Sequence, residues 1–190
     1  MVIPSAFTLI KKNPGNPGTC VMPLYGLIGY PLTHSFSKKY FTEKFERDKT
    51  DDCRYELFPL ASVDELSQLI SRHPSLVGLN VTIPYKQKVL SMLDDREAIP
   101  AQVDACNCIH IQQGRFTGFN TDITGFEKSL QPLLKPHHSH ALVLGNGGAS
   151  AAVQFVLQQL GIAFKVVSRV LHGNSSLTYA ELDRNILEQH

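Results

Sequence analysis

The stretch Leu79–Lys88 carries polar side chains at a spacing suited to an oxygen-rich small molecule. Asn80 and Thr82 share one side of a predicted strand because strand side chains alternate, and Lys86 follows just beyond Pro84, where that strand should end. An amide, a hydroxyl and an ammonium group can bind several oxygens of a polyol, and a desolvated lysine can transfer a proton near neutral pH. The same pattern also fits an edge strand followed by a solvated lysine, so both interpretations stay open.

Two serines at the start of a predicted helix could hold a carboxylate. Ser35 and Ser37 lie directly before the helical pattern Lys38–Arg47. A helix N-terminus exposes amide hydrogens and a partial positive charge, and hydroxyl groups there can add hydrogen bonds to an anion. One of the two serines could instead be only the N-cap of the helix.

A predicted hairpin delivers two further polar residues. Its strands are Val103–Ile111 and Arg115–Phe119, and they present Asn107 and then Asp122. Asp122 comes directly before the predicted helix Ile123–Leu130. An aspartate in this place is either the helix N-cap or an acid–base group, and the residue pattern alone favours the N-cap.

A glycine-rich turn predicts a nucleotide site. A short apolar strand ending at Leu144 is followed by glycines and then by a helix through Val153–Leu160. Glycines in such a turn let the backbone approach a pyrophosphate at the helix N-terminus, as in Rossmann-like dinucleotide-binding folds. The residues that we predict to bind a cofactor in this turn are Gly145, Gly147, Gly148 and Ala149.

The next predicted strand, Phe164–Val167, ends at Ser168 and Arg169. The end of this strand meets the adenosine ribose in such folds, where an acid would bind the free 2′-hydroxyl group and an arginine would pair with a 2′-phosphate. The pair therefore predicts NADP rather than NAD. A solvated arginine after a strand is the alternative.

Composition favours a small-molecule partner. The 190 residues are 43% hydrophobic and 18% charged, with a formal net charge of +1, so the chain can form a core and has no field that would attract nucleic acid. No apolar run is long enough to cross a membrane. The four cysteines and the eight histidines match no disulfide framework or metal motif, which predicts reduced thiols, no metal and a cytoplasmic location.

The order of elements predicts an α/β fold with two domains. Strand, helix, strand, helix and strand follow one another up to Ile83, which indicates a mostly parallel sheet, and a helix is expected from about Tyr85. We predict a flexible leader at 1–22, a catalytic domain at 23–131, a linker rich in Pro and His at 132–140 and a partial nucleotide-binding domain at 141–190. A last helix is expected over Leu177–Gln189.

Together these motifs resemble the shikimate dehydrogenase family over about residues 25–169. The resemblance rests on Ser35–Ser37, on Asn80–Lys86, on Asn107, on Asn120–Asp122 and on Gly145–Ala149, in this order along the chain. It implies that Lys86 and Asp122 are catalytic. It also implies that Ser35, Ser37, Asn80, Thr82 and Asn107 bind the substrate, shikimate or 3-dehydroshikimate.

The resemblance implies the reversible, NADPH-dependent reduction of 3-dehydroshikimate to shikimate, a step of aromatic amino-acid biosynthesis. A related dehydrogenase acting on quinate or another polyol acid is an alternative. Members of this family continue beyond the point matching His190, so the chain is expected to be truncated. Three explanations stay open: a longer natural chain, missing strands supplied by a second copy in a homodimer, or a fragment that binds substrate without turnover. Cys106 and Cys108 share a strand face, and we interpret them as small buried residues rather than a metal or redox pair.

Overall fold

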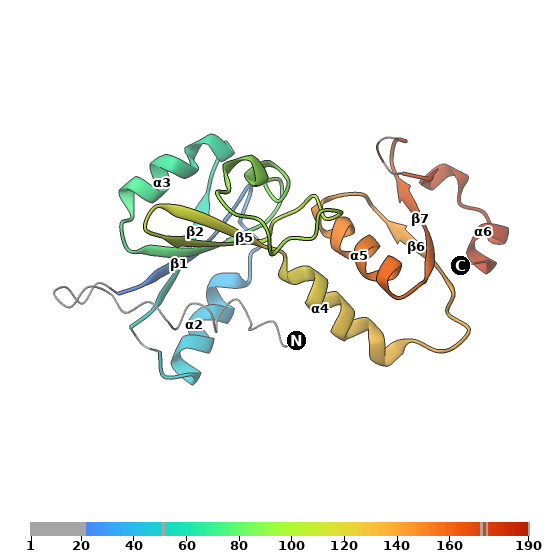
Figure 1. Cartoon of the computed structure of the whole chain (residues 1–190), viewed down its shortest axis with the longest axis horizontal. Helices are drawn as coiled ribbons and strands as arrows, with labels where there is room; N and C mark the ends of the chain where they lie inside the picture. The colour runs from blue at the N-terminus through green and yellow to red at the C-terminus, as the bar shows by residue number, and fades with distance from the viewer. Residues whose placement is uncertain (1–21, 51, 172, 174, 190) are drawn as a thin grey trace. The chain divides into compact units, whose positions relative to one another are not determined.

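The computed structural model describes residues 22–50, 52–171, 173 and 175–189 (Figure 1). The chain forms two compact units. The first holds the described residues up to Ile99 together with Cys106–Phe119, and the second holds Pro100–Ala105 and the described residues from Asn120 onward. The predicted leader at 1–22 lies outside the described residues, apart from Met22.

A five-stranded mixed sheet forms the centre of the first unit, with strand order β2-β1-β3-β4-β5 (Figure 1). Strands β2 and β3 pair in parallel with β1, and β4 and β5 add an antiparallel hairpin. The strands are β1 (Leu24–Gly29), β2 (Arg54–Pro59), β3 (Leu76–Val81), β4 (Cys108–Gln112) and β5 (Arg115–Phe119). The α/β fold class is confirmed, and the first three strands follow the predicted order.

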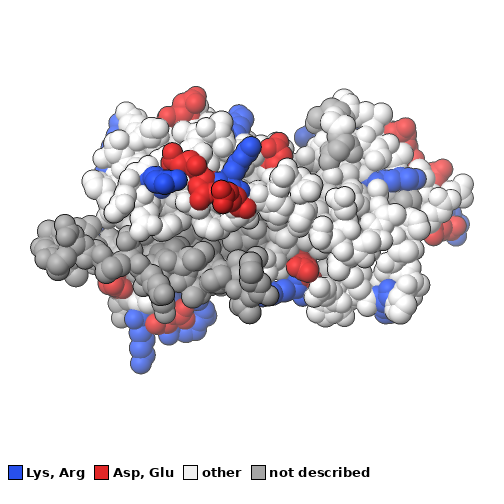
Figure 2. Space-filling model, in the orientation of Figure 1, with Lys and Arg blue, Asp and Glu red and all other residues white. Residues whose placement is uncertain are grey.

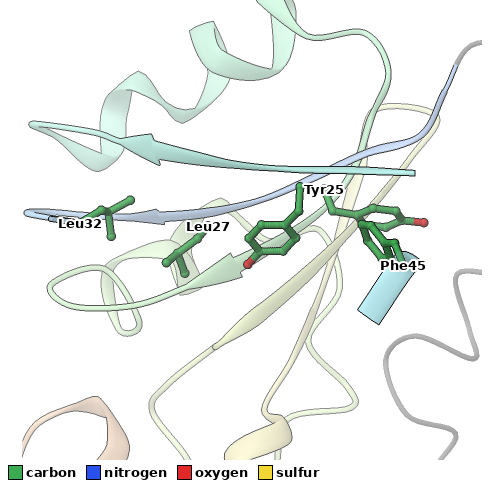
Figure 3. Close-up of a cluster of buried hydrophobic side chains, with 5 residues drawn as sticks. Tyr25, Leu27, Leu32 and Phe45 are labelled. Carbon is green, nitrogen blue, oxygen red and sulfur yellow. The ribbon is translucent and has the colours of Figure 1, made fainter. Parts of the chain in front are cut away.

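The core of the first unit forms because β1 is buried along its whole length. Tyr25 and Leu27 of this strand pack with Leu32, with Tyr55 of β2 and with Phe45 of helix α2 (Ser37–Arg47). The rings of Tyr25 and Phe45 lie 5.8 Å apart between their centroids (Figure 3). This cluster fixes α2 against the sheet, so the start of the helix has a defined place relative to β2.

The segment between β2 and β3 begins with a helix cap. Ser62 and Glu65 form a capping box at the start of the 3₁₀ turn η1 (Val63–Glu65), which leads into α3 (Leu66–Arg72). The side chain of Ser62 accepts from the Asp64 amide, and Glu65 accepts from the Ser62 amide at 2.9 Å. Reciprocal bonds of this kind satisfy the amide groups that a helix start leaves unpaired.

The prediction of a helix from about Tyr85 is wrong. The chain instead forms turns and then the 3₁₀ segment η2 (Lys88–Met92). The Lys86 carbonyl accepts a hydrogen bond from the Cys106 amide at 2.7 Å, and the Leu90 amide donates to Gln87 at 3.2 Å. A helix would need the Lys86 carbonyl for the Leu90 amide, so the bond to a distant residue prevents a regular helix here.

The second unit contains a three-stranded parallel sheet of order β6-β7-β8 and helices on its surface (Figure 1). Its strands are β6 (His140–Leu144), β7 (Ala163–Ser168) and β8 (Leu177–Thr178). Its helical segments are α4 (Thr121–Leu130), η3 (Gln131–Leu133), α5 (Gly148–Gln159), η4 (Tyr179–Glu181) and α6 (Arg184–Glu188). A strand, a glycine turn, a helix and a parallel strand therefore follow in the predicted order.

The division into units falls earlier than the predicted linker 132–140. Helix α4 packs against α5, and Leu130 and Leu134 pack on the buried cluster of Val143, Leu157, Ile162 and Val166. Because these leucines belong to the core of the second unit, α4 folds with that unit and not with the sheet before it.

The prediction of a single helix over Leu177–Gln189 is also wrong. Leu177 and Thr178 pair with Val167 and Ser168 as strand β8, and this pairing removes the first residues from a helix. A capping box then joins Thr178 to Glu181, and the side chain of Asp183 accepts from the Ile186 amide at 2.8 Å to start α6. The segment is a strand and two short helical turns, each with its own start signal.

Charged residues on the face seen in Figure 2 lie in small groups of both signs, and most of the described surface there is neither acidic nor basic. Within the described ranges no helix has the length and apolar character needed to cross a membrane.

Candidate active site

Asn80 of β3 is joined to the start of α2 through a tyrosine. The Tyr55 hydroxyl donates to Asn80 Oδ1 at 2.8 Å, and the Ser37 hydroxyl is hydrogen-bonded to Tyr55. Tyr55 is only 4% exposed, and its ring stacks on Phe41 with centroids 4.4 Å apart and planes 13° apart. Two residues predicted from separate motifs, Ser37 and Asn80, are thus brought into one hydrogen-bonded row.

Ser35 and Ser37 are both half-buried at the start of α2. Ser35 Oγ accepts from the Ser37 amide at 3.3 Å, which holds the two residues together. The N-cap position belongs to Phe36, whose side chain makes no capping bond. The alternative that a serine occupies the N-cap position is therefore wrong.

Thr82 and Lys86 follow β3 in the turn that leads to η2. The Thr82 amide donates to the Ile28 carbonyl at 2.9 Å, and Gly29 comes so close that an added Cβ there would lie 2.4 Å from Thr82 Cγ2. A side chain at position 29 would displace Thr82, so the close approach requires glycine. Both Thr82 and Lys86 are half-buried.

Tyr85 anchors the turn that carries Lys86. Its side chain is buried, and its hydroxyl donates to the Leu60 carbonyl at 2.6 Å. The residue pattern alone assigns Tyr85 no role in binding or catalysis. The available signal was that a buried tyrosine needs a partner for its hydroxyl, and here that partner fixes the turn.

Asn107 lies directly before β4, at the end of the sheet where β3 finishes. Its amide donates to the Phe119 carbonyl at 3.0 Å, and its carbonyl accepts from the Val81 amide at 2.9 Å. Asn107 is buried, and the predicted strand begins later than expected, at Cys108. Its backbone therefore links the last residues of two other strands, beside Thr82.

The two cysteines next to Asn107 are small buried residues, as expected. Cys106 Sγ donates to the Cys108 carbonyl at 3.2 Å. Burial raises the pKa of the Cys108 thiol to about 12 and also raises the pKa of Cys106, so both stay protonated at neutral pH. In the described part of the chain no three potential metal ligands lie together.

Asp122 stands in the first turn of α4 and is half-buried. The cap of this helix is Asn120, whose Oδ1 accepts from the Asp122 amide at 3.1 Å and whose amide group donates to the Ala105 carbonyl at 2.8 Å. The interpretation of Asp122 as N-cap is therefore wrong. Asp122 belongs to the second unit and Lys86 to the first.

The glycine turn lies between β6 and α5 in the second unit. Gly145 has φ +110°, which side chains rarely adopt, and its amide donates to the Val167 carbonyl at 2.7 Å. Gly147 is the N-cap of α5 and makes no side-chain capping bond, and an added Cβ on either glycine would meet open space. Gly148 and Ala149 form the first turn of α5, so this N-terminus has the room and the amide hydrogens that a pyrophosphate needs.

Ser168 and Arg169 stand at the end of β7, beside this turn. Ser168 is 4% exposed and its hydroxyl donates to the Val170 carbonyl at 2.6 Å, whereas Arg169 is exposed. The Asn146 side chain of the glycine turn donates to Ser175 Oγ at 3.0 Å, which joins this turn to the segment after β7. The exposed Arg169 guanidinium at this strand end is chemically suited to pair with a phosphate.

Comparison with known proteins gives three concordant results. Residues 27–109 match the family model of the shikimate dehydrogenase substrate binding domain. The shikimate dehydrogenase (NADP(+)) of Clostridium beijerinckii is 38% identical over 159 residues, which are 82% of this chain and 58% of that protein. A second relative, from Dictyoglomus thermophilum, is 31% identical over 85% of this chain and 59% of its own length. The chain spans about three fifths of the length of these relatives.

Solved structures agree with the sequence relatives. Shikimate dehydrogenase 1 from Peptoclostridium difficile superposes with a TM-score of 0.73 at 28% identity, over 84% of this chain and 62% of that one. The fold and these similarities thus define an α/β protein with two parts. One part matches a substrate binding domain, and the other is a Rossmann-like unit. Within that class, the chain belongs to the shikimate dehydrogenase family.

Proposed function

We propose that this chain takes part in the reversible, NADP-dependent oxidation of shikimate to 3-dehydroshikimate. The observation that carries the proposal is the row of polar groups at the carboxyl end of β3, which lies within the segment matching a shikimate dehydrogenase substrate binding domain. The names of relatives that specify NADP(+) support the cofactor. The first unit would bind the substrate and the second the nucleotide.

Each predicted substrate residue suits one part of such a ligand. Ser35 and Ser37 offer hydroxyls and a helix start to the carboxylate. Asn80, Thr82 and Asn107 surround the end of β3 and would bind the ring hydroxyls. A small cyclic acid with several hydroxyls has the complementary set of groups.

Lys86 and Asp122 are the proposed catalytic residues. NADPH, when bound, supplies the hydride. As negative charge grows on the substrate carbonyl oxygen, Lys86 Nζ would donate the proton, and in the reverse direction it would accept the proton of the shikimate hydroxyl. Asp122 would hold the neighbouring hydroxyl of the substrate.

The nucleotide is proposed to lie on Gly145, Gly147, Gly148 and Ala149, where α5 starts without a side-chain cap. Arg169 would hold the 2′-phosphate, and Ser168 would contribute through its position next to Arg169. A cytoplasmic location agrees with the free thiols of Cys53, Cys106 and Cys108. A homodimer is a further proposal, for which the edge strand β6 offers a surface.

The first experiment is to record shikimate-dependent reduction of NADP⁺ by the purified chain, with calorimetric titration of shikimate alongside it. Turnover supports the complete proposal. Shikimate binding without turnover would limit the chain to substrate binding. Faster oxidation of quinate than of shikimate would transfer the proposal to a quinate dehydrogenase, and absence of binding to either acid would contradict it.

A further inference from the structure

Tyr55 has no place in the reaction proposed above, yet it links two of the proposed substrate residues through its side chain. It sits on β2, between Ser37 of α2 and Asn80 of β3. These partners are 18 and 25 positions away in sequence. Its ring is buried and stacked on Phe41, so the hydroxyl has a fixed place.

The hydrogen bonds of Tyr55 have a direction. The Ser37 hydroxyl donates to the Tyr55 oxygen, and the single Tyr55 proton goes to Asn80 Oδ1 at 2.8 Å. Burial raises the pKa of Tyr55, so the phenol keeps this proton across the physiological range. With its carbonyl oxygen bound to Tyr55, the Asn80 amide turns its NH₂ group away from Tyr55.

We propose that Tyr55 is a positioning residue that fixes the orientation of the Asn80 amide, so that Asn80 presents hydrogen-bond donors to an acceptor oxygen of the substrate. The inference rests on the proposed function. Without the Tyr55 hydroxyl the amide can rotate by 180°, and half of its orientations present the wrong group to the ligand.

The test is shikimate binding by the full chain, measured by calorimetry for Tyr55→Phe, Asn80→Ala and the double variant. Tyr55→Phe keeps the ring stacked on Phe41 and should weaken binding about tenfold, the loss expected for one net hydrogen bond. Asn80→Ala should weaken binding at least as much. In the Asn80→Ala background, Tyr55→Phe should have no further effect.

Tyr25→Phe is the matched control. Tyr25 is a buried tyrosine of the same cluster, on the neighbouring strand β1, and it is not among the residues proposed to bind the substrate. Its variant should bind shikimate as the original chain does. An equal loss from Tyr55→Phe with and without Asn80 would mean that Tyr55 acts by general stabilisation of the core, and the inference would be overturned.

A second measurement covers the case in which Tyr55→Phe does not fold. In the original chain, the side-chain NH₂ resonances of Asn80 are identified by their loss in Asn80→Ala, and saturation with shikimate should shift at least one of them. No shift despite binding overturns the inference and leaves the proposed function intact. No shikimate binding by the original chain overturns both.

Discussion

In the first unit, the predicted ligand residues are joined by hydrogen bonds between elements far apart in sequence, whereas in the second unit they follow one another within a single turn. Ser37 is linked to Asn80 through Tyr55, and the Asn107 carbonyl accepts from the Val81 amide of β3. Gly145, Gly147 and Gly148 need only the turn between β6 and α5. The first set therefore depends on the packing of the whole sheet, and the second depends mainly on local backbone geometry.

The largest expected effect comes from the residue that would move the proton. Lys86→Ala should lower kcat for shikimate oxidation by about 10²–10⁴, because a general acid–base group is lost. Lys88→Ala is the matched control, an exposed lysine two residues along the same segment, and its kcat should stay unchanged. Steady-state rates at saturating shikimate and NADP⁺ make the comparison. Equal rates for Lys86→Ala and the original chain would remove Lys86 from the proposed mechanism.

Thiol reactivity can report on the first unit alone, since all three described cysteines lie in it. Burial and the nearby Asp52 raise the pKa of Cys53 from 9.0 to about 11, and burial raises the pKa of Cys108 to about 12. A raised pKa leaves less thiolate at a given pH. The smaller thiolate fraction, partly offset by the higher nucleophilicity of a more basic thiolate, should slow the reaction of Cys53 with a disulfide reagent at pH 8 by about an order of magnitude relative to the urea-unfolded chain.

The measurement uses Cys20→Ser, so that only the described thiols are counted. The same shifts predict that these thiols favour the folded state below pH 9 and that this stabilisation is lost as the pH rises through about 11 to 12. Urea unfolding at pH 8 and pH 10.5 should show the decrease. Fast thiol reaction in the native chain at pH 8 would argue against a tightly packed first unit.

In the second unit, Arg169→Ala should weaken binding of NADP⁺ about tenfold or more, because a charge-assisted bond to phosphate is lost. Binding of NAD⁺, which lacks the 2′-phosphate, serves as the internal control and should not change. Calorimetric titration with NADP⁺ and with NAD⁺ would measure the two affinities. A parallel loss for both nucleotides would assign Arg169 to general loop structure rather than to phosphate recognition.

The smallest effect concerns the backbone of the glycine turn. Gly145→Ala should lower the free energy of unfolding by about 1–2 kcal/mol because φ is +110° there. Gly125→Ala in the interior of α4, where an added Cβ meets open space, should instead raise stability by roughly 0.5–1 kcal/mol. Chemical denaturation of both variants measures the two changes. Equal stabilities would contradict the inference that the positive φ of Gly145 requires glycine.

The same contrast explains which features could be predicted from the sequence. The strand, glycine turn and helix around Gly145–Ala149 carry a local signal, and their predicted order was confirmed. The capping box at Ser62 and the buried strand β1 carry local signals of the same kind. The helix expected near Tyr85 was wrong because the Lys86 carbonyl binds Cys106, a partner that local patterns do not reveal. The last helix was wrong because Leu177 and Thr178 pair with β7.

The link between Ser37 and Asn80 lay outside local prediction for the same reason. Residues Arg54–Pro59 alternate like a strand, and a tyrosine on its buried side indicated a hydroxyl in need of a partner. That signal could have singled out Tyr55. It could not identify two partners on other elements, since their meeting depends on the order β2-β1-β3 in the sheet.

The division of the chain has a practical consequence for anyone who wishes to prepare its parts. The polypeptide passes from one unit to the other between residues 99 and 100, returns between 105 and 106, and passes again between 119 and 120. A single cut therefore cannot release either part intact. A fragment ending at 131 would keep α4 but lose α5, its packing partner. An independently expressed first unit needs a shortened replacement for Pro100–Ala105 and an end at Phe119.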